Sequence, residues 1–486
     1  MRQLFPLRRY ALLGALLAAP AAAAQDYEPV LLGTAVGRPT AIEFAPGVDD
    51  QLYLAGKQGR IWRFQNGNYN GTPVLDIRAN VNDAGENGLI GFVFDPEFEI
   101  NGYFYLAYTM ESITGVGDSV ISRFTMLPGS VDEADPMSER IIWGPFPQTT
   151  EGHKGGDLEF GPDGMLYHAL GDGDAGSAMN LPTAMDLSDA RGSVLRFDVR
   201  APYPHVPADN PYAGSPTEDQ HIWVSGFRNP FRLDVDPVTG DVFVGDVGAT
   251  AAEEITRISL ATDVGKFAGW PCKEGFACRG FANCVCPGPE YVDPIATLGH
   301  GGSDGACAIM GGTVVRGGAV ASLEGSYLYT DFCSGRFYRI DDPSGAATVV
   351  EISDVLNRGG GNPIRYIVDF TVGNDGLVYF CSHYGAEIWV LEPRGGFSIY
   401  CDAAPNSTGL AASLVASGSA SIAGGALQLD VTNLPPAATG RSIAGVSVEP
   451  PAPRARSATF PIWRICLRRS RSFRGIPGTS STGTGI

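Results

Sequence analysis

One histidine in the sequence stands in a context that suits acid–base chemistry. His153 lies in the stretch EGHKGGDLEFGPDGMLYHALGD, residues 151–172. Imidazole titrates near neutral pH, so it can accept a proton from a substrate hydroxyl without a strongly perturbed environment. Gly155 and Gly156 follow, and residues without a Cβ would let a flat ligand approach the backbone closely. We therefore place a candidate active site here, with a structural hydrogen-bonding histidine as the alternative.

The element that must position His153 is a β-hairpin. Asp163-Gly164 is a tight-turn dipeptide between two short apolar runs, which predicts two antiparallel strands. The same order of turn and aromatic residue recurs at five other positions: Tyr53, Tyr105, Phe243, Tyr329 and Tyr379. Repeats at irregular spacings of roughly fifty residues or more favour propeller blades over a solenoid. We predict an all-β, six-bladed β-propeller, and a large β-sandwich is the alternative.

Composition agrees with this fold and excludes some partners. The chain has 486 residues, of which 64 are Gly and 35 are Pro, and this favours many turns over long helices. Its formal net charge of −19 argues against nucleic acid as a partner, because phosphates are met by Lys and Arg.

The first residues predict export. Arg2, Arg8 and Arg9 precede the apolar run ALLGALLAAP, and AAAA then leads into Gln25. We interpret residues 1–24 as a signal peptide cleaved after Ala24; Arg8-Arg9 leaves a twin-arginine signal as a variant of this prediction. The run is too short to span a membrane, and no later segment is apolar for long enough to do so. The mature protein is therefore expected to be periplasmic or secreted.

The nine cysteines all lie at or after residue 272, and four of them fall within GWPCKEGFACRGFANCVCPG. In an oxidising compartment we expect disulfides, including in this loop, where few apolar residues could hold the backbone. A zinc site made by Cys272, Cys278, Cys284 and Cys286 is the alternative, although the spacings do not match the usual paired knuckles.

Several longer segments resemble a known family. They are GENGLIGFVFDPEFEINGYFYLAYT, HKGGDLEFGPDGMLYHALGDGDAGSAMNL, GFRNPFRLDVDPVTGDVFVGDVGATAAEEI, and IMGGTVVRG followed by GSYLYTDFCSGRFYRI. In this order they resemble the soluble quinoprotein glucose and sorbosone dehydrogenase family, over roughly Gly33 to Pro393. The resemblance implies six blades that carry pyrroloquinoline quinone (PQQ) and Ca²⁺ on one face. It also implies a dehydrogenase that oxidises an aldose at C1 to a lactone and passes electrons to an external acceptor.

The resemblance assigns roles to single residues. His153 matches the general base, and Arg228, Asn229 and Asn87 match positions that contact the cofactor. A guanidinium carries a fixed positive charge on a planar fork, which suits carboxylates and quinone oxygens. The alternative for Arg228 is a structural arginine that braces loops across the central channel.

A calcium position follows from the same resemblance. The backbone carbonyls at Gly248-Ala249 would coordinate the Ca²⁺, and a hard cation accepts such oxygens readily.

Three positions depart from the family pattern. Cys333, Tyr366 and Val368 stand where cations would meet the quinone, with Arg365 one residue out of register. Burial of a tricarboxylate without compensating charge is costly. The alternative function is therefore a non-catalytic secreted propeller that binds carbohydrate or protein, similar to hedgehog-interacting-protein-like propellers.

We also interpret the acidic loop after the hairpin and two further histidines. The acidic loop with Asp172 and Asp174 could bind calcium, but a solvated loop is the expectation, because an EF-hand's glycine and glutamate are missing. His168 is expected to pack within a blade, and His300 is a candidate on the substrate side.

The propeller is predicted to occupy residues 25–395. Residues 396–440 alternate small, hydroxyl and aliphatic residues, which predicts a partial β-rich C-terminal module. Residues 441–486 are rich in arginine against an acidic chain, and this indicates a disordered or frameshifted tail.

Overall fold

The computed structural model describes residues 26–393, apart from 35–36, 49–50, 66–67, 70, 175–182, 282–283, 287, 289–290, 302–304 and 357–362. Beyond residue 393 it describes four short strands: β28 (Phe397–Ile399), β29 (Ser413–Ser417), β30 (Gln428–Thr432) and β31 (Trp463–Ile465). The predicted signal peptide, Cys401 and Cys466 lie outside the described residues. The predicted C-terminal module contains β28, β29 and β30, and β31 lies within the predicted tail.

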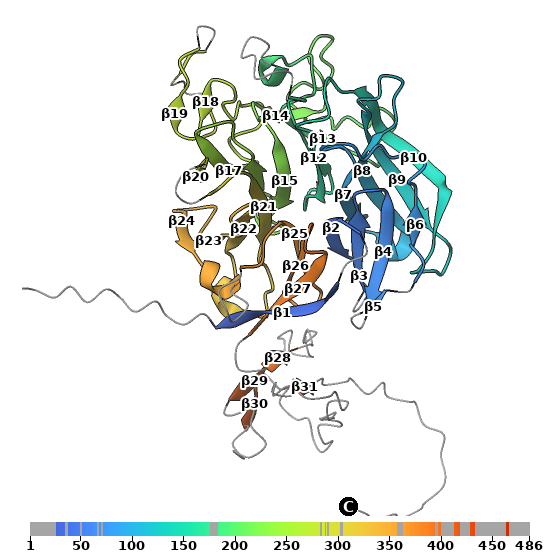
Figure 1. Ribbon diagram of the computed structural model, residues 1–486, viewed down its shortest axis with the longest axis vertical. Coiled ribbons are helices and arrows are strands. Elements are labelled where there is room, and N and C mark those ends of the chain that lie inside the picture. Colours follow the sequence, from blue (N-terminus) through green and yellow to red (C-terminus); the bar gives the residue numbers. More distant parts are fainter. Residues whose placement is uncertain are drawn as a thin grey trace, which may run out of the picture.

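Six sheets, each with four principal strands, form a six-bladed β-propeller (Figure 1). Blade 1 contains β2 (Pro39–Phe44), β3 (Leu52–Gly56), β4 (Arg60–Gln65) and β5 (Asn68–Tyr69), with β6 (Leu75–Asp76) also paired to β4. Blade 2 contains β7 (Leu89–Phe94), β8 (Tyr103–Met110), β9 (Asp118–Met126) and β10 (Ala134–Pro147). Blade 3 contains β11 (Gly155–Phe160), β12 (Leu166–Leu170), β13 (Ser193–Phe197) and β14 (Ile222–Ser225).

The second half of the ring repeats this plan. Blade 4 contains β15 (Pro230–Val235), β16 (Val242–Asp246), β17 (Ala252–Ile258) and β20 (Ala296–Gly299), and the hairpin β18 (Lys273–Glu274) and β19 (Ala277–Cys278) is inserted before β20. Blade 5 contains β21 (Ile309–Val314), β22 (Tyr327–Asp331), β23 (Phe337–Asp341) and β24 (Thr348–Glu351). Blade 6 contains β25 (Ile367–Val372), β26 (Val378–Ser382), β27 (Glu387–Pro393) and the N-terminal β1 (Tyr27–Thr34). Helix in the described part is limited to α1 (Phe98–Asn101) and 3₁₀ turns at Thr183–Met185, Ala321–Leu323 and Ser353–Leu356.

The six-blade prediction and the positions that carried it are confirmed. Each of the six predicted aromatic positions lies on the second strand of a different blade, on β3, β8, β12, β16, β22 and β26. Two of them show why the turn and the aromatic residue recur together. Tyr167 donates a hydrogen bond to Asp163 (2.8 Å), and Tyr379 donates one to Asp375 (2.7 Å), so the tyrosine hydroxyl holds the turn that precedes its own strand.

The first and last strands of the ring close it. In blade 6, β1 pairs antiparallel with β27, with Tyr27 opposite Pro393 and Thr34 opposite Glu387. The strand β1 therefore lies beside β27, the last strand of the ring (Figure 1). Closure matters because a strand edge left open presents unpaired backbone groups to other chains.

Carboxylates on the innermost strands tie neighbouring blades together. Asp157 on β11 accepts a hydrogen bond from the backbone N–H of Leu233 on β15 (2.9 Å). Asp234 on β15 accepts one from Val314 on β21 (2.6 Å), and Asp369 on β25 accepts one from Ile42 on β2 (2.8 Å). Such charge-assisted bonds satisfy backbone donors between adjacent sheets.

One arginine crosses the centre of the ring. Arg232 on β15 is 1% exposed, and it contacts Asp157 (2.7 Å) and Asp369 (3.4 Å). It also donates to the carbonyls of Val368 (2.7 Å), Ile90 (3.2 Å) and Thr40. One guanidinium therefore joins inner strands from five of the six blades.

Candidate active site at the propeller mouth

The candidate site lies at the face where the innermost strands begin. At this end Gly155 of β11 pairs with Leu170, Pro230 of β15 pairs with Asp246, and Ile367 of β25 pairs with Ser382. The segments just before the inner strands and just after the second strands therefore lie together at one face, around the axis of the ring. We call this face the mouth.

His153 precedes β11 and is held tightly. It is 8% exposed and has φ +49°, a backbone conformation that a residue with a Cβ rarely adopts. Its N–H donates to the Glu86 carboxylate (2.7 Å). A Cβ at Gly171 would lie 2.1 Å from the His153 carbonyl oxygen, so glycine at 171 is what allows β12 to end beside it. Backbone strain of this kind gathers at functional sites.

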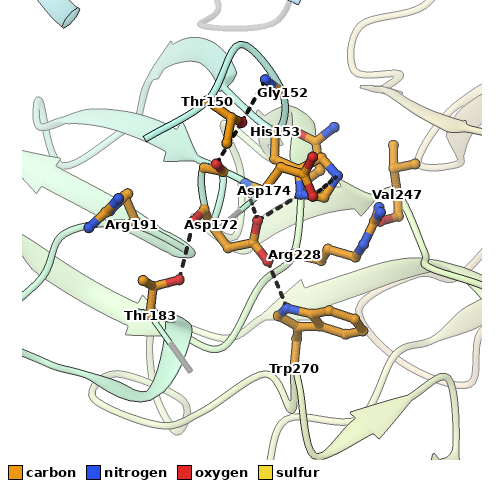
Figure 2. Close-up of polar contacts among 12 residues, drawn as sticks. Thr150, Gly152, His153, Asp172, Asp174, Thr183, Arg191, Arg228, Val247 and Trp270 are labelled. Atoms are coloured by element: carbon orange, nitrogen blue, oxygen red, sulfur yellow. Dashed lines mark hydrogen bonds and ion pairs between the residues drawn. The ribbon is translucent and has the colours of Figure 1, made fainter. Parts of the chain in front are cut away.

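Asp172 fixes the imidazole of His153. The distance from His153 Nδ1 to Asp172 Oδ1 is 2.7 Å, and both residues are buried. The pairing of Gly155 with Leu170 extends to place residue 172 opposite residue 153. Figure 2 shows the carboxylate between the imidazole and the indole of Trp270, whose Nε1 donates to Asp172 Oδ2 (2.9 Å).

This pair suits proton acceptance at one defined atom. When Nδ1 carries the proton donated to Asp172, the neutral imidazole presents a lone pair at Nε2. The nearest carboxylate to Nε2 in the described part of the chain is that of Asp174, at 3.9 Å, beyond hydrogen-bonding distance. The geometry therefore leaves Nε2 available to a ligand in the mouth.

The two glycines after His153 have a different role from the one predicted. A Cβ at Gly155 would lie 2.6 Å from the Ala169 carbonyl oxygen and 2.9 Å from that of Pro230. A Cβ at Gly156 would lie 2.7 Å from the Ile90 side chain. The absence of side chains here lets neighbouring strands approach, rather than a ligand.

Asn229 connects blade 4 to the histidine. Its N–H donates to Asp246 (2.7 Å), its Oδ1 accepts from the Gly155 N–H (3.1 Å), and its Nδ2 donates to Glu86 (3.4 Å). Burial raises the pKa of Asp246 to about 7, against the effect of the hydrogen bonds from Arg228 and Asn229. The predicted residues His153, Arg228 and Asn229 therefore meet in one place.

The Arg228 side chain lies in the predicted calcium region. Its Nη1 donates to the carbonyl oxygens of Val247 (2.9 Å) and Gly248 (2.8 Å). The described turn thus directs two backbone carbonyls at the guanidinium, and two oxygens are fewer than the roughly six to eight that Ca²⁺ takes. The N–H of Ala249, the other predicted calcium residue, donates to Glu274 (2.8 Å).

Asn87 lies beside the site rather than in its hydrogen-bond network. It is fully buried, and its Nδ2 donates to Asn82 (3.2 Å) and to the Val116 carbonyl (2.8 Å). Its neighbour Glu86 makes the contacts with His153 and Asn229 instead.

The three departing positions lie on blades 5 and 6, where an aromatic cluster surrounds Tyr366. Cys333 forms a disulfide with Cys307, and Val368 is 3% exposed within the core. The ring of Tyr366 lies 5.1 Å from those of both Phe332 and Tyr384. None of these three positions supplies a positive charge.

Two arginines lie near this aromatic cluster. Arg365 is exposed, and the guanidinium of Arg38, just before β2, lies 5.4 Å from the Tyr384 ring. The His153 side of the mouth therefore carries the guanidinium of Arg228, whereas Arg38 would have to supply the charge that meets a cofactor carboxylate at the other rim.

The cysteine-rich loop is closed by disulfides. Cys272 pairs with Cys284 and Cys278 with Cys286, so these sulfurs are not the zinc ligands of the alternative interpretation. Cys381 is a free, buried thiol on β26.

The predictions for His168, His300 and the acidic loop have different outcomes. His168 packs within blade 3 as predicted, its Nδ1 lying 2.8 Å from the Asp157 carbonyl oxygen, and burial lowers its pKa to about 4. His300 contacts the fully buried Glu253. Asp172, expected in a solvated loop, is instead buried in the site.

Fold and site together define a closed six-bladed propeller with a buried histidine–carboxylate pair at its mouth. The glucose/sorbosone dehydrogenase family model matches residues 36–388, and the chain belongs to this family. In the described residues, no helix is both long and apolar enough to cross a bilayer.

The individual relatives include a dehydrogenase and a protein named for an interaction. Quinoprotein glucose dehydrogenase B of Acinetobacter calcoaceticus is 26% identical over 301 residues, which cover 57% of this chain and 60% of that protein. Human hedgehog-interacting protein is 32% identical over 188 residues, covering 35% of this chain and 26% of that protein. The chain spans about half of the length of the first curated relatives it matches.

A solved structure shares the fold. The apo form of the soluble aldose sugar dehydrogenase from Escherichia coli superposes with a TM-score of 0.62 at 20% identity. The superposition covers 76% of this chain and 100% of that one.

Proposed function

We propose that the protein is an exported, PQQ- and calcium-dependent sugar dehydrogenase that oxidises an aldose at C1 to a lactone. The observation that carries this proposal is the buried pair of His153 and Asp172 at the mouth. In this pair Nδ1 lies 2.7 Å from the Asp172 carboxylate, and Nε2 is the nitrogen that would contact the substrate. The family membership and the name of the Acinetobacter relative support a quinone cofactor.

In this proposal His153 Nε2 accepts the proton of the substrate's C1 hydroxyl. Bound PQQ would supply the acceptor for the two electrons that leave C1 with the hydride. Arg228 and Asn229 would hold the cofactor beside His153, and the backbone carbonyls at Gly248-Ala249 would contribute ligands to the calcium ion. An external electron acceptor completes the cycle.

The second candidate is a secreted propeller that binds carbohydrate or protein without redox chemistry. It is favoured by the uncharged residues Cys333, Tyr366 and Val368 on blades 5 and 6. The similarity to hedgehog-interacting protein supports it as well.

Dye reduction distinguishes the two functions. Purified protein is incubated with Ca²⁺ and PQQ, and a redox dye is followed while aldoses are added singly. The proposal expects sugar-dependent reduction in the wild type and a loss of roughly 10²–10⁴-fold in kcat in His153→Asn, because a general base contributes about that factor.

The control is His205→Asn. His205 also has a positive φ (+66°), and its imidazole contacts the Ala201 carbonyl (2.7 Å) rather than a carboxylate, so the same substitution should leave kcat unchanged. Saturable PQQ binding without turnover on any sugar would favour the binding protein. Equal activity in His153→Asn and wild type would refute the role of His153.

A further inference from the structure

Trp270 occupies a position that its burial alone does not explain. It stands two residues before Cys272, at the start of the loop closed by two disulfides. Its backbone N–H donates to the Gly226 carbonyl (2.9 Å). Two guanidinium groups lie over its ring, that of Arg279 at 4.5 Å from the centroid and that of Arg228 at 5.7 Å. Cation–π contacts of this kind fix the plane of an indole.

The fixed indole directs its one polar atom at Asp172. Trp270 Nε1 donates to Asp172 Oδ2 (2.9 Å), while Oδ1 contacts His153 Nδ1 (2.7 Å) and accepts from the Asp174 N–H (2.8 Å). In the described part of the chain, Trp270 is the one hydrogen-bond partner of Oδ2. The two oxygens of one carboxylate therefore connect the disulfide-closed loop to the candidate base (Figure 2).

We propose that Trp270 is a positioning residue that acts through Asp172 to hold the His153 imidazole with Nδ1 protonated and Nε2 facing the mouth. Without the indole N–H, the carboxylate could rotate about its Cβ–Cγ bond, and Oδ1 would no longer be fixed opposite Nδ1. The catalytic part of this inference rests on the function proposed above. The geometric part does not, because the imidazole orientation can be observed without turnover.

The test uses Trp270→Phe in the full-length protein. Phenylalanine keeps an aromatic ring in contact with Arg228 and Arg279 but removes the indole N–H. The matched control is Trp389→Phe, which also removes an indole N–H that donates to a carboxylate, that of Glu387 (3.3 Å), on β27 of blade 6, across the ring from Asp172. Imidazole N–H resonances are recorded by NMR on ¹⁵N-labelled protein, and kcat and KM are measured by dye reduction with PQQ and Ca²⁺.

The wild type and Trp389→Phe should show a protected Nδ1–H resonance of His153, assigned by its loss in His153→Asn. Trp270→Phe should lose or broaden that resonance. Its kcat should fall about tenfold with KM nearly unchanged, a fraction of the roughly 10²–10⁴-fold that a general base contributes. In an Asp172→Asn background, Trp270→Phe should change kcat by less than about twofold, because residues that act through one group are not additive.

Two results would overturn the inference. One is a His153 Nδ1–H resonance that persists unchanged in Trp270→Phe. The other is an equal loss of kcat from Trp270→Phe in the wild-type and Asp172→Asn backgrounds. This result would mean that the effect of Trp270 on kcat does not act through Asp172. If the wild type oxidises no sugar, the proposed function fails, and the resonance alone then decides whether Trp270 positions the imidazole.

Discussion

Replacement of Arg232 by methionine should test whether the propeller depends on the charge at its centre. The side chain is 1% exposed and joins Asp157 (2.7 Å) and Asp369 (3.4 Å) to carbonyl oxygens on three inner strands. Methionine fills a similar volume but leaves both carboxylates without their cation. Removal of one partner from a buried ion pair costs about 3–5 kcal/mol, a large part of the roughly 5–15 kcal/mol by which a typical domain is stable.

The loss should depend on pH in a defined direction. Burial already raises the pKa of Asp157, and it raises the pKa of Asp369 to about 7, although Arg232 opposes both shifts. Without the guanidinium these pKa values rise further, so the native state binds more protons than the unfolded chain across a wider window. The stability that protonation provides is present at low pH and is lost as pH rises through the folded-state pKa. Arg232→Met should therefore be destabilised more at pH 8 than at pH 5.5.

Equilibrium urea unfolding, followed by tryptophan fluorescence at both pH values, measures this effect. Arg78→Met is the control, because that arginine and its partner Asp76 (2.8 Å) are both exposed, and a surface change of this kind should leave the free energy of unfolding almost unchanged. Addition of Asp157→Asn and Asp369→Asn to Arg232→Met should recover part of the loss. A loss below about 1 kcal/mol at pH 8, or a larger loss at pH 5.5, would contradict the assigned role of Arg232.

Two further predictions concern the inner strands and the cysteine-rich loop. Burial raises the pKa of Asp234 to about 7, so its contribution to stability is present at low pH and is lost as pH rises through 7. The free energy of unfolding should fall over this range, and Asp234→Asn should flatten the fall in urea titrations from pH 5 to pH 8; an unchanged slope would contradict the shift. Reduction of the disulfides Cys272–Cys284 and Cys278–Cys286 should lower sugar-dependent dye reduction before global unfolding, because this loop supplies Trp270. Far-UV circular dichroism recorded alongside should stay constant, and activity lost only together with it would argue against a local effect.

The sequence predicts the blades because their signals are local. A turn followed by an aromatic residue occupies a few consecutive positions, and the bond between Tyr167 and Asp163 spans four residues. The position of Asp172 was not predictable in the same way. The register next to the turn, with Phe160 opposite Leu166, would put residue 173 opposite residue 153. A register shift between Gly155 and Leu158 places Asp172 there instead, and composition alone suggested a solvated acidic loop.

The other contacts of the site join distant parts of the chain, and no local pattern marks them. Glu86 reaches His153 across 67 residues and Asn229 across 143, and Trp270 reaches Asp172 across 98. Each partner lies on a different blade or inserted loop, so its position depends on how neighbouring sheets pack around the ring. The family resemblance identified residues at the starts of inner strands, such as His153 and Asn229, because the fold itself holds these positions. Glu86 and Asp172 lie within the segments that resemble the family, whereas Trp270 lies outside them, in the disulfide-closed loop before β20. No motif therefore marks the indole that bonds to Asp172.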